Sequence, residues 1–174
     1  MFLNYLKGFS VKKILKNSLL NVKSSSFSGN VKTVGLVIDE SHFSNSRLLV
    51  EEFVANGIAK ENIGLLLYKS KSNVDFASVV TKLNSSHLNW KGQIKNQAVN
   101  DFIATDFDLL VNYYDVEKAI LLVVTNESKA KFKVGFSTID KRLNNLMINT
   151  NQENYTVFVQ ELFRYLKILN KNII

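Results

Sequence analysis

The stretch DFDLLVNYYDVEKAILLVVTNESKAKFKVGF, residues 106–136, holds a strand pattern, a helix pattern and a second strand pattern in succession. A continuous apolar run predicts a buried strand from Phe107 to Tyr114. The apolar run that follows would suit a strand, but flanking charges that match a helix dipole favour a helix from Val116 to about Ser128, capped by Asp115. Lys131 to Ser137 predicts the next strand. This strand–helix–strand order is typical of a parallel sheet.

The alternation of strand and helix patterns continues on both sides of this unit. Short apolar runs predict buried strands at Thr33–Ile38 and Ile63–Tyr68, and Met147-Ile148 begins a short final one. Helical patterns cover Ser46–Asn56, Val74–Leu83, Gln97–Ala104 and Tyr155–Leu169, the first ending at Asn56-Gly57 and the last capped by Asn151 or Asn154. The sequence therefore predicts an α/β fold: a three-layer domain with a mostly parallel, Rossmann-like central sheet of four or five strands.

Residues 1–30 have a different character from the rest of the chain. Their apolar positions recur at the spacing of one helix face, from a cap at Ser10 through Val11, Ile14, Leu15, Leu19 and Val22. Lysines occupy the other side of this face, and a serine- and glycine-rich stretch follows over residues 23–30. We therefore expect a basic amphipathic helical arm and a Ser-rich linker in residues 1–30, followed by a single α/β domain in residues 31–174.

The positive charge of the chain is concentrated in this arm. The formal net charge is +7, and the first 38 residues hold six lysines without any acidic residue. Five of these lysines lie in the arm: Lys7, Lys12, Lys13, Lys16 and Lys23. Such an arm could bind an anionic partner, either an RNA–protein assembly or an anionic membrane surface, or pack its apolar face on this domain or another protein. The alternative is that the charge reflects only a composition rich in lysine and poor in arginine, since surfaces dedicated to nucleic acid usually also use arginine.

The composition excludes several classes of site. The chain has no cysteine and only two histidines, which excludes disulfides, thiolate metal sites, cysteine nucleophiles and multi-histidine metal sites. We therefore expect no metal. The seven glycines do not form a phosphate-binding loop, so we also expect no nucleotide cofactor. No apolar run reaches the length of a signal-peptide core or a transmembrane helix, and we expect a cytoplasmic protein.

Polar residues that follow two of the predicted strands are the candidates for a ligand site. Asp39, Ser41 and His42 follow the first strand, while Asn112 and Asp115 lie at the end of the strand from Phe107. Ligands of doubly wound sheets bind at the carboxyl ends of the strands, and a carboxylate beside a histidine can perform acid–base chemistry. The alternative is that Asp39 and Ser41 cap turns, Asp115 caps a helix and His42 is an ordinary loop residue.

Three segments resemble those of a known family. They are residues 106–136, NWKGQIKN at residues 89–96, and LMINTNQENYTVFVQELFRYLKILN at residues 146–170. Together they resemble a family of small uncharacterised bacterial proteins that is known as a domain of unknown function. The resemblance covers most of residues 33–170 and implies an α/β fold without implying an activity.

A second resemblance is to the N-terminal half of the heptosyltransferase-like GT-B glycosyltransferases. It covers Asp108 to Phe136, where a strand with a polar turn is followed by an apolar helix and a basic strand ending in Gly-Phe. The turn Asp39-Glu40-Ser41-His42 replaces the Gly-Asp turn of those enzymes, and 174 residues leave no room for their nucleotide-sugar domain. This resemblance therefore implies architecture but transfers no function.

Two functions are compatible with these observations. The first is a non-enzymatic cytoplasmic accessory protein whose basic arm docks it on an anionic partner. The alternative is a small-molecule-binding domain or enzyme that uses the loops at the carboxyl ends of the strands.

Overall fold

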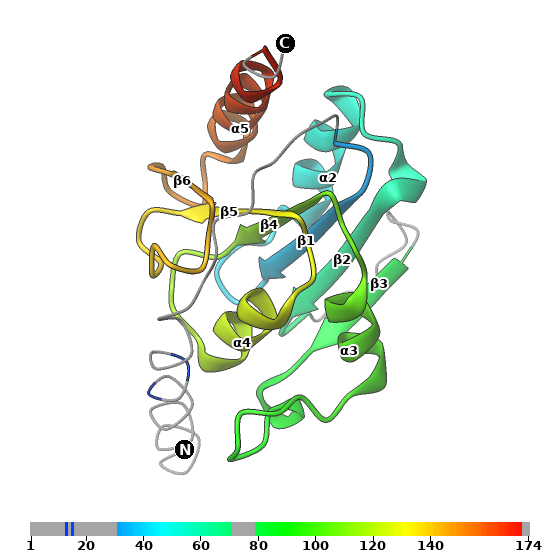
Figure 1. Ribbon diagram of the computed structural model, residues 1–174, viewed down its shortest axis with the longest axis vertical. Helices are drawn as coiled ribbons and strands as arrows, with labels where there is room; N and C mark the ends of the chain where they lie inside the picture. The colour runs from blue at the N-terminus through cyan, green and yellow to red at the C-terminus, as the bar shows by residue number, and fades with distance from the viewer. Residues whose placement is uncertain (1–12, 14, 16–30, 71–78, 172–174) are drawn as a thin grey trace.

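The computed structural model describes residues 13, 15, 31–70 and 79–171, which contain a six-stranded sheet with helices packed against it (Figure 1). The strands are β1 (Val34–Asp39), β2 (Ile63–Tyr68), β3 (Val79–Leu83), β4 (Leu109–Tyr113), β5 (Phe132–Phe136) and β6 (Leu146–Ile148). The helices are α2 (Ser46–Ala55), α3 (Gln97–Ala104), α4 (Ala119–Glu127) and α5 (Tyr155–Lys171), with short 3-10 turns η2 (Lys60–Asn62) and η3 (Ser85–His87).

All neighbouring strands of this sheet are parallel, and their order is β3-β2-β1-β4-β5-β6. The α/β fold and the parallel sheet are confirmed, but the predicted count of four or five strands was too low. The order reverses between β1 and β4, so the loops after these two central strands diverge to opposite sides.

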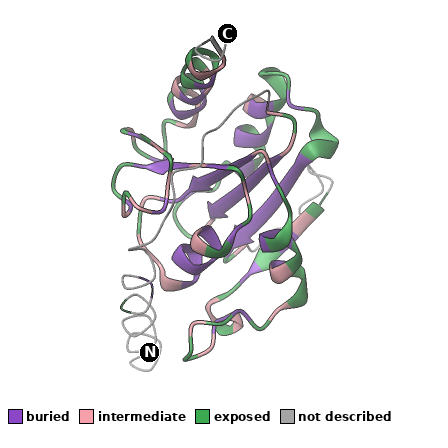
Figure 2. Cartoon of the chain, in the orientation of Figure 1, coloured by how far each residue is buried: buried purple, intermediate pink, exposed green. Residues whose placement is uncertain are grey.

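The apolar runs of the sequence became strands because the sheet is buried on both faces (Figure 2). Leu36 and Ile38 of β1 face one core cluster, which α2 and α5 cover. The intervening Val37 faces a second cluster, which α3 and α4 cover. The sheet is therefore the middle layer between two layers of helices.

Most helices begin and end close to their predicted bounds. Helix α3 matches its prediction, and Gly57 after α2 has a φ of +94°, the left-handed conformation expected beyond a helix end. Two predictions were wrong. The helix expected over Val74–Leu83 is contradicted by strand β3, and α4 begins at Ala119, with Lys118 rather than Asp115 at its N-cap position. Asp115 therefore does not cap this helix.

The predicted arm lies outside the described residues except for Lys13 and Leu15. Lys13 is exposed, while Leu15 is 6% exposed and belongs to the core cluster under α3 and α4. This burial favours packing on the domain at that one position. Among the residues that the structure describes, no helix is both long and apolar enough to cross a bilayer.

Two glycines make room for an aromatic ring beside the sheet. Gly35 of β1 and Gly64 of β2 are register partners, and the Phe107 ring lies against both. A Cβ atom at Gly35 would lie 2.8 Å from Phe107 Cδ2, and one at Gly64 would lie 2.9 Å from Phe107 Cζ. Phe102 of α3 packs on the same ring, with ring centroids 5.1 Å apart. Glycine is required here because any side chain would displace Phe107.

The residue after Phe107 fixes the start of β1 and β4. Asp108 Oδ2 accepts hydrogen bonds from the amides of Lys32 and Thr33 at 2.9 and 3.0 Å, and Oδ1 accepts one from Lys131 Nζ at 2.8 Å. Burial would raise the pKa of Asp108, but these hydrogen bonds outweigh it and lower the pKa from 3.8 to about 2.

The lowered pKa of Asp108 predicts a specific acid sensitivity. A carboxylate with a depressed folded-state pKa stabilises the fold above its unfolded pKa, and this contribution disappears as the pH falls through the folded value. Between pH 5 and about pH 2, wild type should therefore lose about 1–2 kcal/mol more unfolding free energy than Asp108→Asn. Urea unfolding across this pH range measures the difference. Glu153→Gln, at an exposed carboxylate, should follow wild type, and an Asp108→Asn curve parallel to wild type would contradict the prediction.

Candidate functional site

Part of the predicted site assembles at the carboxyl end of β1. Asp39 is the last residue of β1 and is 1% exposed. The amide and hydroxyl of Ser41 donate to Asp39 Oδ1 at 3.0 and 2.6 Å, and the Lys118 ammonium forms an ion pair with Asp39 Oδ2. Lys118 Nζ also donates to Ser41 Oγ at 2.6 Å. We call Asp39, Ser41 and Lys118 the carboxyl-edge cluster.

The polar side chains next to this cluster also have partners within the protein. The Lys118 ammonium lies over the Tyr68 ring, 4.9 Å from its centroid, and the Tyr68 hydroxyl lies 2.7 Å from Ser85 Oγ. Glu40 accepts a hydrogen bond from the hydroxyl of Ser46, the first residue of α2. A carboxylate thus lies where doubly wound domains bind phosphate at a helix N-terminus, which disfavours an anion there.

His42 does not form the expected dyad with a carboxylate. Its side chain is exposed, and its amide donates to the Asp39 backbone carbonyl at 3.3 Å. The carboxylate of Asp39 is bound by Ser41 and Lys118 instead. The imidazole has no hydrogen-bond partner within the described part of the chain, so this structure provides no orienting group for acid–base chemistry at His42.

Among the described residues, the other two predicted residues make no hydrogen bond or ion pair with this cluster. Asn112 is fully buried on β4, where it accepts a hydrogen bond from Thr125 Oγ1 at 2.8 Å and donates to Asn144 Oδ1 at 2.7 Å. Asp115 is partly exposed, and its backbone carbonyl accepts from Thr138 Oγ1 at 2.9 Å. Asn112 therefore belongs to an internal network beneath α4.

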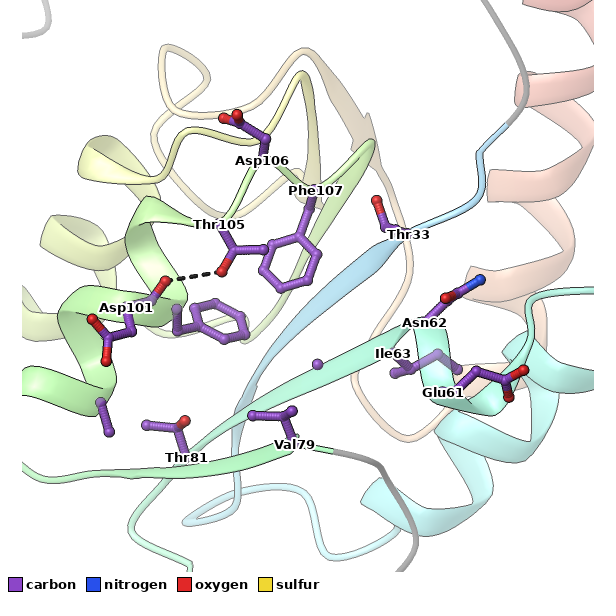
Figure 3. Close-up of a pocket in the computed structure, with 13 residues that line it drawn as sticks. Thr33, Glu61, Asn62, Ile63, Val79, Thr81, Asp101, Thr105, Asp106 and Phe107 are labelled. Carbon is purple, nitrogen blue, oxygen red and sulfur yellow. Dashed lines mark hydrogen bonds between the residues drawn. The ribbon is translucent and has the colours of Figure 1, made fainter.

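A cavity of about 370 Å³ opens at the opposite edge of the sheet, at the amino ends of the strands (Figure 3). Ala98, Asp101 and Phe102 line it from one face of helix α3, at the spacing i, i+3, i+4, and Thr105 lines it from the position directly after the helix. Ile63, Val79 and Thr81 line it from β2 and β3, and Phe107 from the segment before β4. We call this space the amino-edge cavity.

The interior of the amino-edge cavity is mainly apolar. Phe102, Phe107 and Ile63 are all buried side chains on its wall. Two threonine hydroxyls on the wall are bound by the protein, since Thr33 Oγ1 accepts from the Asp108 amide at 3.0 Å and Thr105 Oγ1 donates to the Asp101 carbonyl at 2.9 Å. These groups make the cavity suitable for a ligand with an apolar body.

Thr81 is the exception among these polar groups. The residue is 6% exposed, and its hydroxyl makes no hydrogen bond with any described residue. Figure 3 shows Thr81 beside Val79 on the wall of the cavity, opposite Phe107. The hydroxyl is therefore available to a water molecule or a ligand in the cavity.

The rim of the amino-edge cavity is acidic. Glu61, Asp101 and Asp106 are exposed residues among those that line it, and none of the described lining residues is lysine or arginine. The rim therefore opposes the positive charge of the whole chain and disfavours an anionic ligand. The sequence analysis missed this cavity because its lining residues come from four separate segments.

Comparison with known proteins identifies the family but not an activity. The model of a family of unknown function, DUF6913, matches residues 7–169. Searches of curated proteins and of solved structures found no match. The expected resemblance to a domain of unknown function is confirmed, whereas the resemblance to glycosyltransferases has no support. Because the match spans almost the whole chain, this protein belongs to the family of unknown function DUF6913.

Proposed function

We propose that this protein is a small-molecule-binding domain whose Rossmann-like sheet and helix α3 hold a ligand in the amino-edge cavity. The observation that carries the proposal is the cavity of about 370 Å³. Its volume lies within the range of about 300–1,000 Å³ that is typical of ligand pockets. Its walls are helix α3 and strands β2 and β3, which are elements that keep a binding site in a fixed shape.

The amino-edge cavity is favoured over the carboxyl-edge cluster as the ligand site because the polar side chains of the cluster already have hydrogen-bond partners within the protein. Asp39, Ser41 and Lys118 bind one another, and Glu40 is bound to Ser46. A ligand at that edge would have to displace these contacts. The loops after β1 and β4 remain a second candidate, because Ser41 and His42 are exposed where the strand order reverses.

A pair of substitutions on α3 tests the proposal. Ala98 and Ala104 are both exposed on this helix, but Ala98 lines the cavity and Ala104 does not. Phenol and cyclohexanol, titrated separately and followed by amide chemical shifts in NMR, should perturb residues around Phe102 and Phe107. Ala98→Phe should abolish these shifts by filling the space, and Ala104→Phe should leave them unchanged. Shifts that are absent in wild type, or that persist in Ala98→Phe, would overturn the proposal.

A separate proposal is that the basic arm docks the protein, as a non-enzymatic accessory factor, on an anionic partner. It is supported by the six lysines without an acid in the first 38 residues and by the exposure of Lys13. Since Leu15 is buried, deletion of the arm would also remove a core side chain. Five Lys→Gln substitutions, at positions 7, 12, 13, 16 and 23, avoid this problem.

The five Lys→Gln substitutions should abolish salt-sensitive binding to an anionic surface. Wild type should co-sediment with phosphatidylserine-containing vesicles or with ribosomal particles at low salt and be released at high salt, because each lysine near an anionic surface contributes about 1 kcal/mol. The substituted protein should remain in the supernatant at both salt concentrations. Equal sedimentation of the two proteins would reject docking through the arm.

A further inference from the structure

Thr81 gives the wall of the amino-edge cavity a neutral hydroxyl for polar recognition. Its hydroxyl has no partner among the described residues, although the residue is 6% exposed. The other two threonines of the wall already use their hydroxyls within the protein. A ligand that enters the cavity can therefore gain one hydrogen bond to a neutral side chain at this position.

The apolar part of the lining favours an organic ligand over water. Phe102, Phe107, Ile63 and Val79 contribute apolar side chains to the cavity wall. A molecule with an apolar body and one polar group satisfies both the hydroxyl and the apolar wall.

The walls favour an aromatic body. Phe102 and Phe107 present two ring systems whose centroids are 5.1 Å apart and whose planes meet at 49°. Phe107 cannot retreat toward the sheet, because its ring already lies against Gly35 and Gly64. Aromatic pairs with offset or tilted geometry are favourable beyond the area they bury.

The charge of the rim restricts the ligand further. Asp101 and Asp106 are exposed at the margin of the cavity, and the Asp101 carboxylate is bound by Gln97 Nε2 at 2.7 Å, a neutral donor. A carboxylate or phosphate entering between them would be repelled, whereas an uncharged molecule would not. Figure 3 shows Asp106 on one margin and Glu61 on the opposite one.

From these observations we propose that the amino-edge cavity binds an uncharged aromatic molecule with one hydroxyl-type polar group, which hydrogen-bonds to Thr81 Oγ1. This inference rests on the proposed ligand-binding function and names the class of ligand. It assigns Thr81 as the residue that selects a polar aromatic ligand over a purely apolar one.

The test compares phenol, toluene and benzoate, which share a ring and differ in the polar group. In NMR titrations, wild type should bind phenol about fivefold more tightly than toluene, the effect of one neutral hydrogen bond. Thr81→Val, which keeps the shape of the side chain, should remove this preference, and Thr81→Ser should restore it. Benzoate should bind at least about tenfold more weakly than phenol. The double variant Asp101→Asn, Asp106→Asn should reduce this difference in affinity between phenol and benzoate. The control Glu153→Gln should leave the difference unchanged.

The outcomes separate this inference from the proposed function. If none of the three probes shifts the amides around the cavity, the proposed function itself fails. If toluene and phenol bind equally, and Thr81→Val changes neither, the cavity binds ligands but the role of Thr81 is wrong. If benzoate binds as well as phenol, the exclusion of anions is wrong.

Discussion

Replacing Lys118 by methionine should lower the free energy of unfolding by about 3 kcal/mol, because it leaves the Asp39 carboxylate buried without a cation. Asp39 is 1% exposed, whereas the Lys118 side chain is 21% exposed. This partial exposure places the expected loss at the lower end of the range for buried pairs. Methionine keeps most of the apolar stem of lysine, so the change isolates the charge. Urea unfolding at neutral pH measures the effect.

A matched lysine and a double mutant complete this experiment. Lys69 lies over the same Tyr68 ring at 5.7 Å but has no ion pair with a described acidic residue. Lys69→Met should therefore change the unfolding free energy by less than about 0.5 kcal/mol. Asp39→Asn combined with Lys118→Met should recover much of the loss, since neither buried charge remains. Equal effects of the two lysine substitutions would contradict a stabilising ion pair at the carboxyl edge.

The central part of the fold was predictable because it is buried on both faces. Strands β1, β2 and β4 each consist entirely of buried residues, which appears in the sequence as uninterrupted apolar runs. Strand β3 lies at the edge of the sheet, and only Thr81 and Leu83 of its five residues are buried. Its broken pattern was compatible with a helix, and the three residues of β6 are too few for periodicity to act as a guide.

The candidate site was predictable only in part, because the sequence analysis looked for polar residues at the carboxyl ends of strands, where doubly wound sheets bind ligands. Asp39 and Ser41 lie together because Asp39 ends β1 and Ser41 follows it in the next turn. Lys118, which completes the cluster, is separated from Asp39 by 79 positions, and nothing in its local sequence marks it as a partner. The cavity could not be predicted for a similar reason, since Ala98, Asp101 and Thr105 resemble an ordinary solvent-facing stripe of a helix until β2 and β3 are placed beside them.

Asn112 illustrates how a polar residue in an apolar run can be read in two ways. The sequence analysis placed it in a ligand-binding loop, whereas the structure buries it completely on β4. Tyr114 OH lies 2.7 Å from Thr125 Oγ1, which itself donates to Asn112 Oδ1. Thr125 has a single proton, so Tyr114 must be the donor in the first of these contacts. Burial raises the pKa of Tyr114, which keeps this donor protonated.

Asn112→Ala should therefore lower the free energy of unfolding by about 3 kcal/mol, through a buried cavity and through the loss of partners for Thr125 and Asn144. Tyr114→Phe removes only the first donor of the chain and should cost about 1 kcal/mol. Combining Asn112→Ala with Thr125→Val should cost less than the sum of the single changes, because the two side chains share one hydrogen bond. Urea unfolding of wild type, Asn112→Ala, Thr125→Val and the double variant measures this coupling. If Asn112 served a ligand rather than the core, Asn112→Ala would leave stability near that of wild type, and the two changes would be additive.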